Sequence, residues 1–159
     1  MINGFKKFQF DDVKYLNLIK SLLLSELKKL SKNKKITFAN YHNFIDDKQH
    51  QHIQWELTNY FRDKKLHVLC FESIRELLYT YFGQSILIQK NPFLRIARPL
   101  KSEDNIGLHK DTIYGQSPYE MSIHVPLMSL GSKSCLKFAK NSHLIDDKKI
   151  KFIKSENLI

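Results

Sequence analysis

Hydrophobic residues in the first half of the chain recur at spacings of three and four, which is typical of amphipathic helices. The first such stripe consists of Val13, Leu16, Ile19, Leu23, Leu27 and Leu30. Asp11 and Asp12 directly precede the stripe, and aspartate is a common N-cap residue. The pattern therefore predicts a helix that is capped by these carboxylates and ends near Leu30.

Two further helices are predicted before residue 84. One lies within residues 44–61, where Asp46 or Asp47 can cap it. The other runs from about residue 66 to residue 82. Gly83 follows it directly, and glycine is the residue most often found just past a helix end. Residues 1–83 are therefore expected to form a mainly helical layer.

The second half of the chain changes to short runs of β-branched and aromatic residues, separated by Pro, Gly, Ser and Asn. The five runs are residues 85–90, 93–98, 120–127, 135–140 and 149–154. Helices followed by a series of strands predict an α+β fold, with the helices packed on an antiparallel sheet or jelly roll. At 159 residues the chain is expected to be a single domain, with its strand layer in residues 84–159.

Composition and charge bear on whether the chain binds nucleic acid. The formal net charge of +10 invites a nucleic-acid-binding interpretation. The basic residues are nearly all lysines scattered along the chain, however, whereas base and phosphate recognition favours arginine. We therefore regard nucleic-acid binding as the weaker alternative.

Membrane insertion and secretion are not expected, and neither is a disulfide. The longest apolar runs are much shorter than a membrane span, and the N-terminal residues lack the apolar core of a secretory signal. The expected location is therefore cytoplasmic. Cys70 and Cys135 lie apart from each other in apolar patterns, which predicts small core residues and not metal ligands.

The most informative short motif is His109-Lys110-Asp111. In an extended segment, residues two positions apart project to the same side, so an imidazole and a carboxylate can reach one cation. Two histidines and one carboxylate on one face of the metal are the ligands of non-haem iron(II) oxygenases. The spacing by itself is weak, because pairs of this kind also arise by chance.

The segments around this motif resemble a known family. "RIARP" at residues 95–99 precedes the pair, and "HVPL" at 124–127 and "AKNSH" at 139–143 follow it in the same order. The succession over about residues 85–144 resembles the phytanoyl-CoA-hydroxylase-like branch of the Fe(II)/2-oxoglutarate-dependent dioxygenases. It looks closest to the subgroup found beside carbohydrate and aminoglycoside biosynthesis genes.

The resemblance implies a fold, an activity and two bound groups. The fold would be a double-stranded β-helix, or jelly roll, with helices packed on it. The activity would be hydroxylation of a small, carbohydrate-related molecule, with iron(II) as cofactor and 2-oxoglutarate as cosubstrate. His109 and Asp111 would be metal ligands, and Tyr114 and His124 would contact the cosubstrate. His124 departs from the family pattern, which has another aromatic residue there.

The resemblance also implies that part of the barrel is missing. His143 matches a family turn, "G-S-H", which is not the usual source of the second metal histidine, so His143 is either a turn residue or, against the family order, a metal ligand. The second metal histidine and the arginine that binds 2-oxoglutarate usually follow in an "H-G…N…R" stretch, which does not occur in residues 144–159. Lys154 could substitute for the arginine only as a point charge. We therefore expect a partial jelly roll, in a chain that is C-terminally truncated, is a degenerate descendant, or is completed by a segment of another chain.

Several alternatives remain open at this point. Arg95 and Arg98 either bind an anionic substrate or line a sheet edge. His124 either faces a pocket or is an ordinary core or surface histidine. The remaining histidines are expected at the surface: His42, His50, His52 and His67. The chain is either an oxygenase-family enzyme or a catalytically inactive jelly-roll module that binds a partner. The oligomeric state is not predicted.

Overall fold

The computed structural model describes residues 4–10, 13–111, 117, 120–131, 134–146 and 148–149. The chain divides into two compact units. The helical unit comprises residues 10–104, and the second unit comprises residues 1–9 and 105–159.

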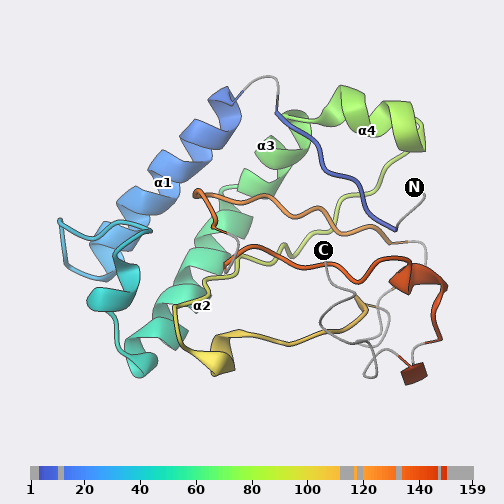
Figure 1. Ribbon diagram of the computed structural model, residues 1–159. Coiled ribbons are helices and arrows are strands. Elements are labelled where there is room, and N and C mark those ends of the chain that lie inside the picture. The colour runs from blue at the N-terminus through green and yellow to red at the C-terminus, as the bar shows by residue number, and fades with distance from the viewer. Residues whose placement is uncertain are drawn as a thin grey trace. The chain divides into compact units, whose positions relative to one another are not determined.

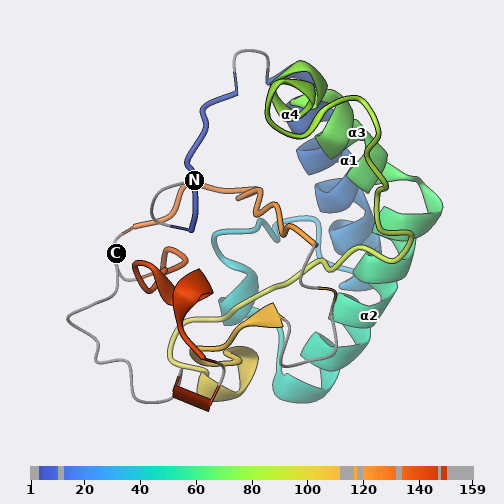
Figure 2. The ribbon, with the colours of Figure 1, turned by 90° about the vertical axis from the view of Figure 1, so that its right-hand side faces the viewer.

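The helical unit has three helices that contact one another pairwise, as Figures 1 and 2 show. These are α1 (Lys14–Leu30), α2 (Asp47–Asp63) and α3 (Leu66–Glu72). A fourth helix and two 3₁₀ turns complete the unit: α4 (Arg75–Phe82), η1 (Tyr41–Asn43) and η2 (Ser102–Asp104). The fully buried side chains of the core are Ile19, Leu23, Leu27, Ile36, Leu57 and Leu66.

The predicted first helix is confirmed as α1. Its buried residues are Leu16, Ile19, Leu23 and Leu27, which belong to the predicted stripe. Val13, the N-cap residue, is 47% exposed and makes no side-chain capping bond. The predicted caps Asp11 and Asp12 lie outside the described residues.

The predicted second helix is confirmed as α2, and Asp46 is its cap. The Asp46 carboxylate accepts the backbone N–H of Gln49 at 2.8 Å, and the Gln49 side chain accepts the backbone N–H of Asp46 at 3.3 Å. This reciprocal capping box satisfies two N–H groups that a helix start would otherwise leave without partners.

The predicted third helix is two shorter helices, α3 and α4. The break falls at Ser73 and Ile74, where the Ser73 hydroxyl donates to the carbonyl oxygen of Leu69 at 2.8 Å. Serine competes with the backbone for hydrogen bonds in this way, which lowers its helix propensity. Gly83 ends α4 with a φ of +75°, as its position predicted.

The predicted jelly roll is wrong. Among the described residues the structure contains helices, turns and irregular segments, with one isolated bridge residue at Ala139 and no sheet. The runs at 85–90, 93–98, 120–127 and 135–140 form no strands, and most of the run at 149–154 lies outside the described residues. The α+β assignment therefore fails at its β component.

Residues 92–98 show why a strand-like pattern can occur without a sheet. Their exposure alternates, with Leu94, Ile96 and Arg98 less exposed than Phe93 and Arg95 between them. The backbone of this segment bonds to side chains of α2. The Gln54 amide oxygen accepts the Ile96 N–H at 3.1 Å. The Thr58 hydroxyl, which donates to the Gln54 carbonyl at 2.8 Å, also lies 3.4 Å from the Leu94 carbonyl oxygen. Alternation here follows from packing on a helix and not on a second strand.

The described residues of the second unit form irregular segments and short turns, among them η4 (Ser142–Leu144). Its aromatic contacts link parts of the chain that are far apart in sequence. The rings of Phe5 and Phe138 stack with centroids 4.9 Å apart, and His124 lies edge-on to Phe138 at 6.3 Å. These ring contacts join described residues that belong to no helix or strand.

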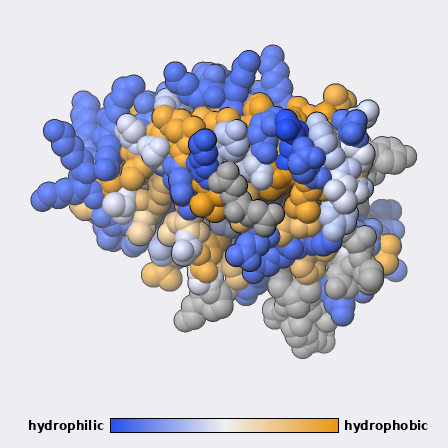
Figure 3. Space-filling model, turned by 90° about the horizontal axis from the view of Figure 1, so that it is seen from above, coloured by the Kyte–Doolittle hydropathy of each residue, from blue (hydrophilic) through white to orange (hydrophobic). Residues whose placement is uncertain are grey.

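Large hydrophobic side chains remain exposed in both units, including Trp55 at 65% and Phe93 at 77%. Figure 3 shows hydrophobic residues interspersed with hydrophilic ones on the face it presents. Within the described part of the chain, no helix combines the length and apolarity needed to cross a membrane.

The contact between residues 92–98 and α2 can be tested by changing Gln54. We expect Gln54→Ala to lower the free energy of unfolding by about 1 kcal/mol, because the Ile96 N–H loses its partner. The measurement is urea unfolding followed by circular dichroism. Gln51→Ala, on the exposed side of the same helix, is the control and should leave stability nearly unchanged. Equal losses in both variants would contradict the contact.

Candidate functional site

The loop that carries His109 begins with a tight local turn. The side-chain oxygen of Asn105 accepts the backbone N–H of Gly107 at 3.0 Å. Gly107 has a φ of +76°, in the left-handed region where a side chain would be strained. Asparagine followed two residues later by glycine is a local signal for this kind of turn. The turn determines where the Gly107 carbonyl points.

That carbonyl determines the tautomer of His109. The Nδ1 atom of His109 lies 2.8 Å from the Gly107 oxygen. A carbonyl oxygen can only accept, so Nδ1 must carry the proton and donate it. In the neutral ring Nε2 then has no proton and presents a lone pair. Histidines that bind metals are commonly oriented by the same second-nitrogen contact to a backbone carbonyl.

The second ring nitrogen of His109 faces a carboxylate. The Nε2 atom lies 3.5 Å from Oδ1 of Asp111. Both atoms are acceptors when the ring is neutral, so this approach is favourable only with a positive charge between or on them. A proton on Nε2 or a bound metal ion can supply that charge. The pair therefore has the electrostatics of a cation site.

The distance and exposure suit a metal ion. Metal–donor bonds of about 2.1 Å allow two ligands of one ion to lie up to about 4.2 Å apart, and the two donor atoms are 3.5 Å apart. The side chains of His109 and Asp111 are 26% and 46% exposed, so an ion can reach them from solvent. The described residues contain no group of three or more histidine, cysteine or acidic side chains that could hold a metal.

Among the described residues, His124 and His143 do not form a metal-binding group with His109 and Asp111. His124 is exposed, with its ring edge-on to Phe138. His143 lies in the turn η4, where its ring packs so closely on Gly4 that a Cβ there would come within 2.3 Å of it. Tyr114 and Lys154 lie outside the described residues.

Arg98 of the helical unit is in a different environment, a buried ion cluster. Its guanidinium donates to both carboxylate oxygens of Asp104, at 2.8 and 2.9 Å, and to Oδ1 of Asp47 at 2.6 Å. Lys101 also contacts Asp47, with the ammonium 2.8 Å from Oδ1. The Arg98 side chain is only 4% exposed. Its charge is already paired within the protein, so the alternative of an anionic-substrate site at Arg98 is not supported.

The ion pairs of this cluster shift the pKa values of their members. The hydrogen bonds from Arg98 lower the pKa of Asp104 to about 2, and they raise the pKa of Arg98 above its usual range. The exposed Asp47 has a lowered pKa because it accepts hydrogen bonds from Lys101 and Arg98. Arg95, two residues before Arg98, is exposed.

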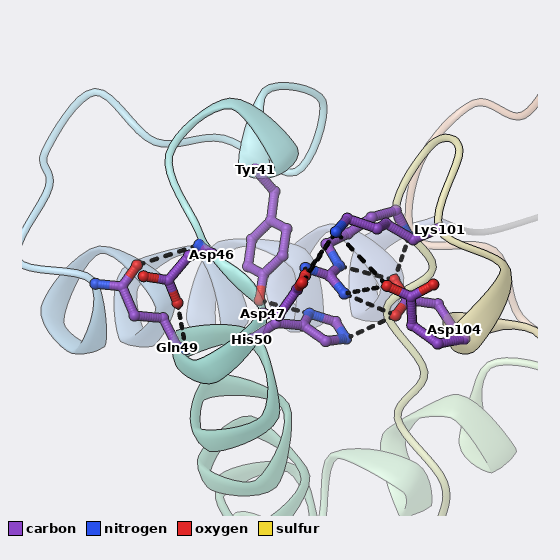
Figure 4. Close-up of polar contacts among 9 residues, drawn as sticks. Tyr41, Asp46, Asp47, Gln49, His50, Lys101 and Asp104 are labelled. Atoms are coloured by element: carbon purple, nitrogen blue, oxygen red, sulfur yellow. Dashed lines mark hydrogen bonds and ion pairs between the residues drawn. The ribbon is translucent and has the colours of Figure 1, made fainter.

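His50 extends the cluster into the core, between Tyr41 and Asp104 (Figure 4). The Tyr41 hydroxyl lies 3.0 Å from Nδ1, and Nε2 lies 3.5 Å from Oδ1 of Asp104. A neutral ring with its proton on Nε2 suits both partners, because Nδ1 then accepts from the tyrosine. Burial lowers the pKa of His50, and burial raises the pKa of Tyr41 to about 12.

The structure corrects three predictions about individual residues. His50 is buried and not at the surface, and His67 is half-buried, whereas His42 and His52 are exposed as expected. Cys135 is exposed and not a core residue. Cys70 is half-buried, and burial raises the pKa of its thiol to about 11.

The Arg98 cluster was missed at the level of sequence. Asp47 and His50 are three residues apart at the start of α2. Asp104 follows Arg98 by six residues and is the last residue of η2. Each half shows a charge pattern, but nothing in the sequence indicates that the two halves meet.

Comparison of the chain with family models, curated proteins and solved structures found no match.

Arg98 gives a sharp stability prediction. We expect Arg98→Met to lower the free energy of unfolding by about 3–5 kcal/mol, because it leaves the buried Asp104 carboxylate without a countercharge. Arg95→Met is the matched control on the exposed side of the same segment, and its effect should stay within about 0.5 kcal/mol. Urea unfolding measures both. A small loss for Arg98→Met would show that the cluster does not stabilise the unit.

His50 gives a pH prediction. Its folded-state pKa lies below the ordinary value of 6.5, so the folded state disfavours its protonation. Its stabilising contribution is therefore present above about pH 6.5 and is lost as the pH falls through the lower folded-state pKa. Unfolding free energies measured from about pH 7 to about pH 5 should fall less steeply for His50→Gln than for wild type. His52→Gln, at an exposed position, should keep the wild-type slope, and an unchanged slope in His50→Gln would contradict the prediction.

Proposed function

We propose that His109 and Asp111 bind a divalent metal ion, and that the chain is a member of the Fe(II)/2-oxoglutarate-dependent oxygenases acting on a small, carbohydrate-related molecule. The observation that carries the metal site is the approach of the His109 Nε2 atom to Oδ1 of the Asp111 carboxylate, at 3.5 Å. The order of the segments around His109 supports iron(II) as the metal and 2-oxoglutarate as the cosubstrate.

The donor atoms fit a first-row divalent ion. A neutral imidazole nitrogen and a carboxylate oxygen are two of the three ligands in the iron(II) oxygenase arrangement, and imidazole also suits other transition metals. The Gly107 carbonyl keeps the ring in the tautomer that places a lone pair on Nε2. The described residues can thus supply two ligands of such a cation.

The described residues have limited roles in the proposed reaction. When bound, iron(II) and 2-oxoglutarate would together supply the oxygen chemistry that hydroxylates a C–H bond of the substrate. His109 and Asp111 would hold the metal, and their partial exposure leaves its other positions accessible. Of the residues proposed for the cosubstrate, Tyr114 lies outside the described residues and His124 lies against Phe138. The substrate and cosubstrate classes therefore rest on the family resemblance.

A second candidate function is a non-catalytic module that binds metal weakly or not at all. It is favoured by the finding that the described part of the chain brings no third metal-binding side chain to His109 and Asp111. Two protein ligands leave most of the coordination sphere to water. Such a site can bind an ion without activating oxygen.

Metal titration tests the proposed site. We expect the purified chain to bind Mn(II), a redox-stable substitute for Fe(II), and His109→Ala to abolish this binding because it removes the nitrogen donor. Calorimetry gives the affinity, and EPR of the bound Mn(II) reports coupling to an imidazole nitrogen. His42→Ala, an exposed histidine of the helical unit, is the control and should bind like wild type.

Equal Mn(II) binding by wild type and His109→Ala would contradict the site. If the site holds, conversion of 2-oxoglutarate to succinate in the presence of Fe(II) and oxygen separates the two candidate functions. Turnover that His109→Ala loses would support the oxygenase. Metal binding without any turnover would support the non-catalytic module.

A further inference from the structure

The Asp111 carboxylate has a second partner that the family resemblance does not assign. The hydroxyl of Ser122, eleven residues further along the chain, donates a hydrogen bond to Oδ2 of Asp111. The other oxygen, Oδ1, is the atom that faces Nε2 of His109. The two oxygens of one carboxylate therefore have different neighbours.

We propose that Ser122 is a positioning residue of the cation site, an inference that rests on the proposed function. By bonding Oδ2, Ser122 keeps Oδ1 directed toward His109 and the metal. Asp111 would then hold the ion through Oδ1, the oxygen that Ser122 leaves available. Hydrogen bonds of this kind to metal-binding carboxylates raise metal affinity because they orient the ligand in advance.

The surroundings of Asp111 give this contact its importance. The Asp111 side chain is 46% exposed, so packing leaves its carboxylate free to rotate. Rotation would exchange the two oxygens and move the charge away from His109. A loss of rotational freedom on metal binding costs free energy, and a bond that already restricts the rotation reduces that cost.

A role in packing does not account for Ser122. Its side chain is exposed, and the flanking residues Met121 and Ile123 are 43% and 49% exposed. A small polar residue at such a position usually contributes little to stability. Its one described side-chain bond is the bond to Asp111, which points to a role in the site.

The test compares Mn(II) binding by wild type, Ser122→Ala and Ser122→Thr. We expect Ser122→Ala to lower the Mn(II) affinity about 10-fold, with an unchanged melting temperature and retained imidazole-nitrogen coupling in the EPR spectrum, because His109 still binds. Ser122→Thr keeps the hydroxyl and should restore the wild-type affinity. Ser129→Ala, another exposed serine of the same unit, is the control and should bind like wild type.

The outcomes separate this inference from the proposed function. If His109→Ala abolishes binding while Ser122→Ala binds like wild type, the metal site stands and the role of Ser122 is overturned. A loss that Ser122→Thr does not restore, or that Ser129→Ala reproduces, also overturns it. If wild type itself binds no Mn(II), the proposed site and the role of Ser122 both fail.

Discussion

The guanidinium of Arg98 is the group on which the organisation of the helical unit depends. A buried charge is stable only when its partners satisfy it, and here Asp104 does so through two oxygens while Asp47 supplies a third. These contacts join the irregular chain after α4 to the start of α2. They also bridge a turn in which Leu100 has a φ of +62°, an unfavourable conformation that persists only when its surroundings impose it.

The same electrostatic rule leads to a different result at His109 and Asp111. In the helical unit the protein provides the positive charge that two carboxylates require. In the His109 loop a ring nitrogen and a carboxylate oxygen approach each other as two acceptors, since the Gly107 carbonyl engages the other nitrogen. The helical cluster is neutralised by the protein's own charges, whereas the His109 pair requires a protonated ring or the bound ion that we propose.

The parts of the fold that could be predicted are those determined by local contacts. The stripe of α1 and the capping box at Asp46 require only residues within a few positions of one another. The predicted strands failed because a strand requires a partner. The alternation over residues 92–98 indicates one buried side, and it does not indicate whether a sheet or a helix covers that side. Gln54 and Thr58 of α2, about forty residues earlier, supply that partner.

In the candidate site, too, the features set by local contacts could be predicted and those set by distant contacts could not. The spacing of His109 and Asp111 could be predicted to bring two donors together, and Gly107 with Asn105 is a readable turn signal. Ser122 could not have been found, because its hydrogen bond to Asp111 joins two residues that lie eleven positions apart in the sequence. That bond makes the two oxygens of Asp111 inequivalent. A histidine and an aspartate at this spacing can form an ordinary surface ion pair, and it is the separate engagement of Nδ1 and Oδ2 that leaves Nε2 and Oδ1 directed at a common point.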